Sequence, residues 1–132
     1  MITLEAVLDR TAFLRRVLMV DAATCIAMGV LLTLFAIPLA TLLGLPSILL
    51  AYAGAGLFPI GGFMAWLALR QDASRWGARV VILGNAGWVA GSVLVLFLAS
   101  PTAIGHAFVI IQAVVVVFLA ELEYTGLRRI AS

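Results

Sequence analysis

The pattern of polar and apolar positions divides the chain into four long apolar stretches joined by short turn-forming or charged segments. These stretches cover approximately residues 17–42, 47–69, 80–99 and 102–122. A helix needs about 20 mostly apolar residues to cross roughly 30 Å of hydrocarbon, and each stretch is long enough. Lipid offers no partner to an unpaired backbone group, so the spans are expected to be helices. The pattern predicts an all-α polytopic membrane protein with four transmembrane helices.

Short connections between these stretches favour an antiparallel four-helix bundle. The segment Gly44-Leu45-Pro46 is expected to form the first turn, and Ser100-Pro101-Thr102 to contribute to the third. Helices joined by short connections pack as antiparallel neighbours. The length of 132 residues predicts one four-helix domain over residues 1–132.

The first sixteen residues precede the first span and show a helical spacing of apolar side chains. Leu4, Val7 and Leu8 follow that spacing, while Glu5 and Asp9 are offset from them. An amphipathic helix of this kind lies in the membrane interface. We expect a short N-terminal interfacial helix, which either leads into the first span or presents a docking surface for a partner.

The basic residues are sorted between the two sides of the predicted bundle. All eight are arginine, and they lie before the first span, between the second and third, and after the fourth: Arg10, Arg15, Arg16, Arg70, Arg75, Arg79, Arg128 and Arg129. The other two connections contain no arginine or lysine. Loops rich in basic residues stay in the cytoplasm, so the sequence predicts that both termini and the middle loop are cytoplasmic.

The composition agrees with a membrane protein and argues against several other classes. Hydrophobic residues make up 65% of the chain and charged residues 11%, whereas soluble domains are about half apolar and about a quarter charged. The net charge is only +2 and no nucleic-acid motif is present, so no nucleic-acid partner is expected. Cys25 is the only cysteine and cannot form an internal disulfide.

Metal and cofactor chemistry has little support in the sequence. His106 is the only histidine and lies near the outer end of the fourth span. One histidine without Cys, Asp or Glu beside it is a poor metal site. The chain also shows no nucleotide-binding loop and no nucleophile–base pair. We therefore expect no cofactor and no metal, and we rank a membrane enzyme last among the candidate functions.

Glycine and proline give the second and third spans an unusual backbone. Pro59 lies within the sequence AGAGLFPIGG, where it removes one backbone hydrogen bond. This predicts a kink or close helix packing at Pro59, with a hinge or binding site as the alternative. In the third span, Gly84, Gly87 and Gly91 form a face of small residues that lets another backbone approach closely. That contact is expected either within the chain or between protomers.

Polar residues from three different spans are predicted to lie at one depth. Counted from the nearest arginine on the same helix, Asp21 is about 7–8 Å, Asn85 about 9 Å and Glu121 about 10 Å deeper in the membrane, at 1.5 Å per residue. Polar groups are costly there and usually face the bundle interior. Trp88 shares a face with Asn85, and Tyr124 shares one with Glu121. These five residues are the candidate ligand- or proton-binding residues.

Two interpretations of these polar residues stay open. In the structural one, arginines pair with the carboxylates and Asn85 links two helices. In the functional one, Asp21 and Glu121 share a proton, or bind a cation or a cationic ligand. Gln112 lies near the centre of the fourth span and points away from Glu121. It is expected to hydrogen-bond another helix or another protomer.

The stretches GNAGWVAGS and AELEYTGLRR, together with the GLP turn, resemble small four-helix proteins of the bacterial inner membrane. The architecture is also loosely similar to that of DoxX-like proteins, although no functional residue of that group can be matched in this sequence. The resemblance implies a four-helix fold and a location in the bacterial inner membrane.

Two functions follow from these features. The sequence favours an accessory or interaction subunit that packs against itself, as a homo-oligomer, or against a larger membrane complex through its glycine faces. Its other partners would be membrane lipids. The alternative is a small-molecule or ion-binding or transport protein that uses the intramembrane carboxylates.

Overall fold

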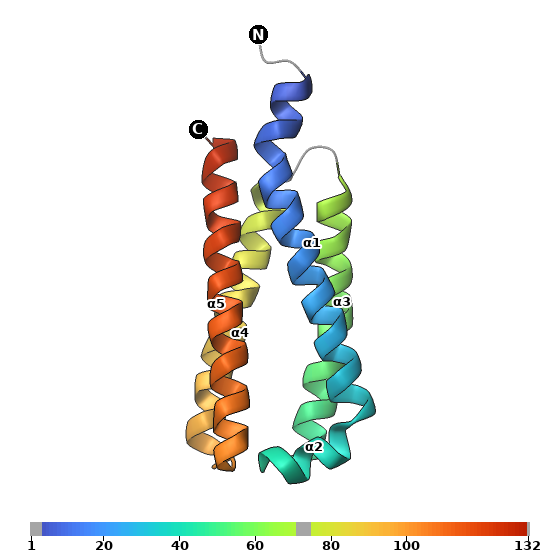
Figure 1. Ribbon diagram of the computed structural model, residues 1–132, viewed down its shortest axis with the longest axis vertical. Helices are drawn as coiled ribbons and strands as arrows, with labels where there is room; N and C mark the ends of the chain where they lie inside the picture. The colour runs from blue at the N-terminus through green and yellow to red at the C-terminus, as the bar shows by residue number, and fades with distance from the viewer. Residues whose placement is uncertain (1–3, 71–74, 132) are drawn as a thin grey trace.

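The computed structural model describes the backbone of residues 4–70 and 75–131, and the side chains of residues 11–70 and 75–129. The described residues form five helices and no strand, which confirms the all-α prediction (Figure 1). The helices are α1 (Leu4–Leu34), α2 (Ala36–Leu43), α3 (Ser47–Leu69), α4 (Arg75–Leu98) and α5 (Ala103–Ala131). Four segments are long and apolar enough to cross a membrane: Thr11–Leu34, Ser47–Leu69, Arg75–Leu98 and Ala103–Arg129.

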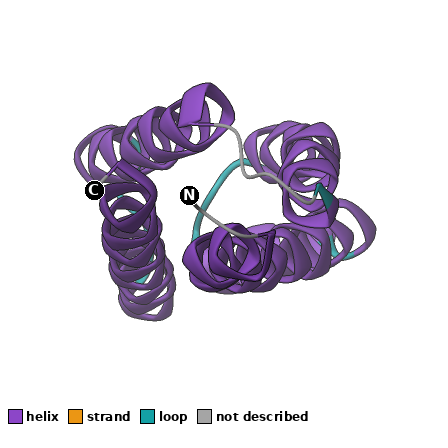
Figure 2. Cartoon of the chain, turned by 90° about the horizontal axis from the view of Figure 1, so that it is seen from above, coloured by secondary structure: helices purple, strands orange, loops and turns teal. Residues whose placement is uncertain are grey.

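The four long helices are arranged as two pairs. α1 packs along α3, and α4 packs along α5. The pairs meet mainly where α1 contacts α5, whereas α4 barely touches α3. Figure 2, seen along the helices, shows the pairs as separate groups. In Figure 1 the short α2 lies across one end of the molecule, and the ends of the chain are at the opposite end.

The first apolar stretch is not one continuous helix, which corrects the span expected over residues 17–42. α1 ends at Leu34, and α2 begins at Ala36 after Phe35, whose backbone has φ −114° and ψ 27°. Pro38 explains the break, because it has no N–H to donate to the carbonyl of Leu34 and its ring clashes with that carbonyl. Proline is tolerated in the first turn of a new helix, so α2 can begin here.

The N-terminal interfacial helix is also not a separate element. α1 is continuous from Leu4 to Leu34, and the segment able to span a membrane begins at Thr11. Leu14 is fully buried in a cluster that includes Leu67 of α3 and Leu127 of α5, so this part of α1 packs inside the bundle. The amphipathic side chains of residues 4–9 lie outside the described ones.

Glycines bring α1 and α3 into close contact. A Cβ on Gly54 would lie 2.8 Å from Leu32 Cβ, and one on Gly61 would lie 2.8 Å from Ile26 Cδ1. Backbones approach this closely only where side chains are absent. Pro59 lies inside α3, which stays helical through it, and its side chain is exposed. The close packing in this span is therefore made by glycines and not by the proline.

The turn after α2 is tied to the start of α5. Gly44 ends α2 in the left-handed conformation, with φ 70°, which glycine adopts without steric cost. The backbone N–H of Thr102 donates to Leu43 O at 3.0 Å, and its hydroxyl donates to Leu42 O at 2.9 Å. These bonds tie the start of α5 to the end of α2.

Candidate functional site

Three polar side chains from three helices meet inside the bundle at one level. Asp21 of α1, Asn85 of α4 and Glu123 of α5 are only 2%, 6% and 0% exposed. The amide nitrogen of Asn85 (Nδ2) donates to Asp21 Oδ2 at 3.0 Å and to Glu123 Oε1 at 2.7 Å. One amide group therefore bridges two carboxyl groups and uses both of its hydrogens to do so.

The helical repeat explains why these side chains face the interior. Residues four apart lie on the same face of a helix. On α5, Glu123 lies four residues from both Leu119 and Leu127, and both leucines are buried. On α4, Asn85 lies four residues after the buried Val81. The polar cluster thus interrupts faces that are otherwise apolar and packed.

The second carboxyl group of the cluster comes from Glu123, which corrects the expectation for Glu121. Glu121 and Tyr124 are both exposed, Tyr124 by 51%. Tyr124 lies instead beside Arg128, whose Cζ is 5.9 Å from the ring centroid. Two residues turn a helix by about 200°, so Glu121 points away from the face that carries Glu123.

The depth argument could not separate the two glutamates, because they differ by only about 3 Å along the helix axis. A signal for the correct residue was nevertheless present in the sequence. Gln112 and Glu123 are eleven residues apart, which is close to three full helical turns. Polar side chains at that spacing share one face, whereas Gln112 and Glu121 lie on opposite faces.

Neither buried carboxyl group is paired with an arginine in the described part of the chain. Glu123 Oε2 has no hydrogen-bond partner there, and Asp21 accepts from the Asn85 amide and the Cys25 thiol. Arg15 Nε instead donates to Ala68 O at 3.1 Å. One part of the structural interpretation, the pairing of arginines with carboxylates, is thus not seen among these residues. Its other part is seen, because Asn85 links α4 to α1 and α5.

The Asp21–Asn85–Glu123 cluster needs a compensating positive charge. Removing a single charge from water costs several kcal/mol. Two carboxylates that share one site cannot both stay ionised without compensation. The pair must therefore hold a proton or a cation.

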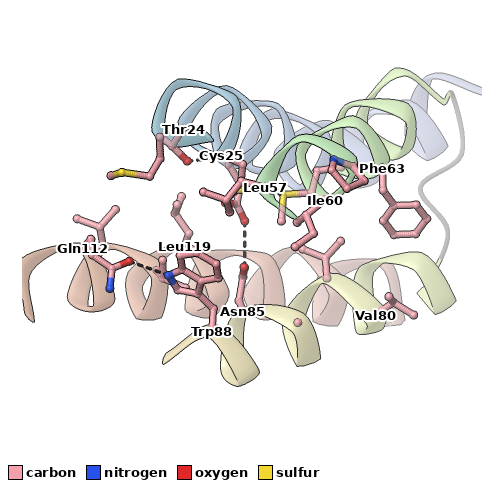
Figure 3. Close-up of a pocket in the computed structure, with 18 of the residues that line it drawn as sticks. Thr24, Cys25, Leu57, Ile60, Phe63, Val80, Asn85, Trp88, Gln112 and Leu119 are labelled. Carbon is pink, nitrogen blue, oxygen red and sulfur yellow. Dashed lines mark hydrogen bonds between the residues drawn. The ribbon is translucent and has the colours of Figure 1, made fainter. Parts of the chain in front are cut away.

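A half-open cavity of about 630 Å³ lies beside the cluster, between the α1–α3 pair and the α4–α5 pair. Asp21 and Asn85 form part of its wall. Figure 3 shows side chains of α1 and α3 facing those of α4 and α5 across this space, most of them apolar, including Leu57, Ile60 and Phe63 of α3 and Leu119 of α5. Its volume lies within the range of about 300–1,000 Å³ that is typical of small-molecule sites.

A second polar group lies one helical turn further along α4. The indole N–H of Trp88 donates to Gln112 Oε1 at 2.7 Å, and Gln112 Nε2 donates to Ser92 Oγ at 2.8 Å. Gln112 therefore links α5 to α4 within the chain, which is one of the two alternatives that the sequence left open. Trp88 and Gln112 also line the cavity, so both polar groups border it.

A smaller cavity of about 400 Å³ adjoins the first on the side of α2. The two cavities share the side chains of Met28, Trp88, Phe108 and Gln112. Leu45, next to the turn that ends α2, forms part of the far wall. Together the cavities make an apolar space that runs from the Asp21–Asn85–Glu123 cluster toward the α2 end.

The glycine face of α4 borders these cavities and packs against no described helix. A Cβ at Gly84, Gly87 or Gly91 would meet no described atom within 4 Å. Gly84 lines the larger cavity, and Gly87 and Gly91 line the smaller one. Pro59 lines the larger cavity from the opposite side. The lack of side chains on this face of α4 thus widens the cavities.

The single cysteine also borders the larger cavity. Cys25 is half-buried, and its Sγ lies 3.7 Å from Asp21 Oδ1 and 3.9 Å from Met64 Sδ. His106 is exposed, with Nδ1 3.0 Å from Thr102 O. Among the described residues, no group of three or more His, Cys, Asp or Glu could hold a metal ion.

Comparison of the chain with protein-family models, with curated proteins and with solved structures finds no match. The likeness to DoxX-like proteins stays a prediction. Function is therefore inferred from the cavities and the polar groups at their walls.

Proposed function

We propose that the protein binds a small amphipathic molecule in the cavity between its two helix pairs. The observation that carries this proposal is the 630 Å³ apolar space with Asp21 and Asn85 at its wall. An apolar pocket with a few convergent polar groups is the usual form of a small-molecule site. Of the two functions that the sequence suggests, this is the ligand-binding or transport alternative.

The shape of the site supports a ligand with one polar end. The apolar walls favour a hydrocarbon body, because it packs against them and leaves few polar groups without a partner. A wholly apolar ligand would leave the partly satisfied carboxyl groups without a new partner. A polar head group beside Asp21 supplies that partner, and the adjoining smaller cavity accommodates the rest of a longer ligand.

We also propose that the four helices are antiparallel spans of the bacterial inner membrane, with both termini in the cytoplasm. The arginines support this orientation. Arg15 lies in the first half of α1, Arg79 in the first two turns of α4 and Arg128 in the last turn of α5, and these parts of the helices lie toward the end of the molecule opposite α2 (Figure 1). The α2 end carries no arginine or lysine in the described chain. Basic segments are retained on the cytoplasmic side. We expect that a reporter protein active only in the cytoplasm is active when it is fused to either terminus.

Filling the cavity tests the proposed function. A leucine at Gly84 would enter open space in the larger cavity, whereas one at Gly62 would enter open space outside both cavities. We expect the protein in lipid nanodiscs to bind dodecyltrimethylammonium, dodecanol or both above the level of empty nanodiscs. Gly84→Leu should reduce that binding at least tenfold, and Gly62→Leu should leave it unchanged. Equal binding by the two variants would show that the cavity is not the site.

A second candidate function is the accessory or interaction subunit that docks through the glycine face of α4. The open space at Gly87 and Gly91 favours it, because a helix from a second copy or a larger membrane complex could approach there. Native mass spectrometry of the protein extracted in its own lipids should then show a defined assembly. Gly87→Leu or Gly91→Leu should abolish it, and a monomer unaffected by either change would contradict this function.

A further inference from the structure

We infer that the Asp21–Asn85–Glu123 cluster accepts the cationic head group of an organic amphiphile and releases one proton in exchange. The inference rests on the proposed function, because it requires the larger cavity to be the ligand site. It adds the chemical class of the ligand and the ion that leaves when the ligand binds.

The cluster is short of hydrogen-bond donors. Its two carboxyl groups offer four oxygen atoms, and the Asn85 amide donates to only two of them. Asp21 Oδ1 has the Cys25 thiol at 3.7 Å, a weak donor, and Glu123 Oε2 is buried without a partner among the described residues. A buried acceptor without a donor is costly, so the site is built for an additional proton or cation.

The charge of the cluster selects a positive head group. Two carboxyl groups repel an anion, and a neutral hydroxyl adds a donor without adding charge. Trp88 lines the same cavity, and the face of an indole ring attracts cations.

The rest of the cavity selects an organic ion. The wall is mainly apolar, and no metal-binding group of three or more residues is found in the described chain. A small metal ion would lose its water shell here without gaining enough oxygen ligands. An ammonium group on a hydrocarbon body matches both the carboxyl groups and the walls.

Exchange with a proton keeps the net charge of the cluster constant. A change in net charge is expensive away from water, so a cation enters at lowest cost when one proton leaves. The O–H bond of the carboxyl group that holds the proton breaks, the proton passes to water, and the cation balances the charge of the two carboxylates; no electron is transferred. Asp21 is the expected contact for the cation, because it lines the cavity and Glu123 does not.

The side chains around Asp21 and Glu123 determine which variants are needed as controls. In the described chain α1 contributes Cys25, α4 contributes Asn85, and α3 contributes Met64 through its contact with Cys25. The Cys25 thiol is the one other titratable group among them. Raising the pH favours loss of the exchanged proton, so the affinity for the cation should rise with pH, by up to about tenfold per unit.

Dodecyltrimethylammonium tests the exchange, because it carries a permanent charge and has no proton of its own to release. The wild-type protein in weakly buffered nanodiscs should release about one proton per bound cation, as reported by a pH indicator. Dodecanol, with the same chain and no charge, should bind without proton release and without pH dependence.

Three variants test whether the proton comes from the Asp21–Glu123 pair. Asp21→Asn should lose proton release and at least tenfold in cation affinity while still binding dodecanol. Glu121→Gln, which changes an exposed carboxyl group, and Cys25→Ala should both behave like the wild type. Loss of proton release in Cys25→Ala would assign the proton to the thiol and overturn the inference.

The experiment distinguishes a failure of the proton exchange from a failure of the proposed ligand-binding function. Cation binding without proton release, or equal and pH-independent binding of the two probes, overturns the exchange and leaves the cavity as a ligand site. Failure of both probes to bind the wild-type protein contradicts the proposed function as well. If Asp21→Asn does not fold, the number of protons that the wild-type protein releases and the pH dependence of its affinity still show whether the exchange occurs.

Discussion

Two sets of glycines in this protein have opposite surroundings. In α3, a Cβ on Gly54 would meet Leu32 Cβ at 2.8 Å, so the absence of a side chain is used to bring α1 close. On α4, a Cβ at Gly84, Gly87 or Gly91 would enter open space beside the cavities. The same residue type therefore tightens one helix pair and widens the gap in front of the other. The spacing of glycines in the sequence predicts a helix face of small residues, but it does not predict whether another helix packs against that face.

The two regions are also held together by different interactions. α1 and α3 rely on close approach of their backbones, whereas side-chain hydrogen bonds connect the middle of α4 to α1 and α5. Asn85 links α4 to α1 and α5, and the Trp88–Gln112 bond adds a second link to α5. If this contrast is correct, changes that add volume should harm the first region and changes that remove donors should harm the second.

The largest effect is expected from adding volume between α1 and α3. Gly54→Leu should lower the free energy of unfolding by about 3 kcal/mol or more, because Leu32 Cβ and the Gly29 carbonyl leave no room for a side chain. Gly87→Leu adds the same volume in open space and should change the stability by less than about 1 kcal/mol. Unfolding in detergent micelles measures both. Equal losses would remove the contrast between the two glycine faces.

The next largest effect is expected from removing the amide that bridges the carboxyl groups. Asn85→Leu should lower the free energy of unfolding by about 2 kcal/mol, since two buried carboxyl groups each lose a donor. Ala86→Leu places the same side chain at the adjacent, exposed position of α4 and is the matched control. Unfolding in detergent micelles again measures the free energy of unfolding of both variants. A stability unchanged by Asn85→Leu would mean that the bridge contributes nothing to holding α4.

The helices were largely predictable from the sequence because their signal is summed over about twenty apolar residues. The boundary at Phe35 was missed because it depends on one residue, Pro38, inside an otherwise uniform apolar run. The level of the polar cluster was predictable from distance along each helix. Its second carboxyl group was not, because Glu121 and Glu123 differ little in depth and mainly in direction around the helix.

The cavity could not have been predicted from the sequence, for a related physical reason. A glycine face is compatible with a packed neighbour or with empty space, and only the relative placement of α3 and α4 decides between them. Gly54 and Gly84 show both results in one chain. Periodicity around each helix, as in the spacing of Gln112 and Glu123, would have identified the inward faces but not the distance between the helices that carry them.

The smallest effect is expected from removing the Trp88–Gln112 hydrogen bond, the second polar link of α4. This change tests whether the bond stabilises the fold. Trp88→Phe keeps a ring at the cavity wall but removes the N–H that donates to Gln112 Oε1 at 2.7 Å. The free energy of unfolding should fall by about 1 kcal/mol, the usual size of an interhelical hydrogen bond in a membrane protein. Trp76→Phe, at a side chain that is 70% exposed, should cost less than half as much.

The expected loss for Trp88→Phe is smaller than for Asn85→Leu, because Gln112 also donates to Ser92 Oγ and keeps that bond to α4 after the change. Equal effects of the two tryptophan substitutions would mean that Trp88 acts only as part of the cavity wall, and the Asn85 bridge would then be the principal polar link of α4.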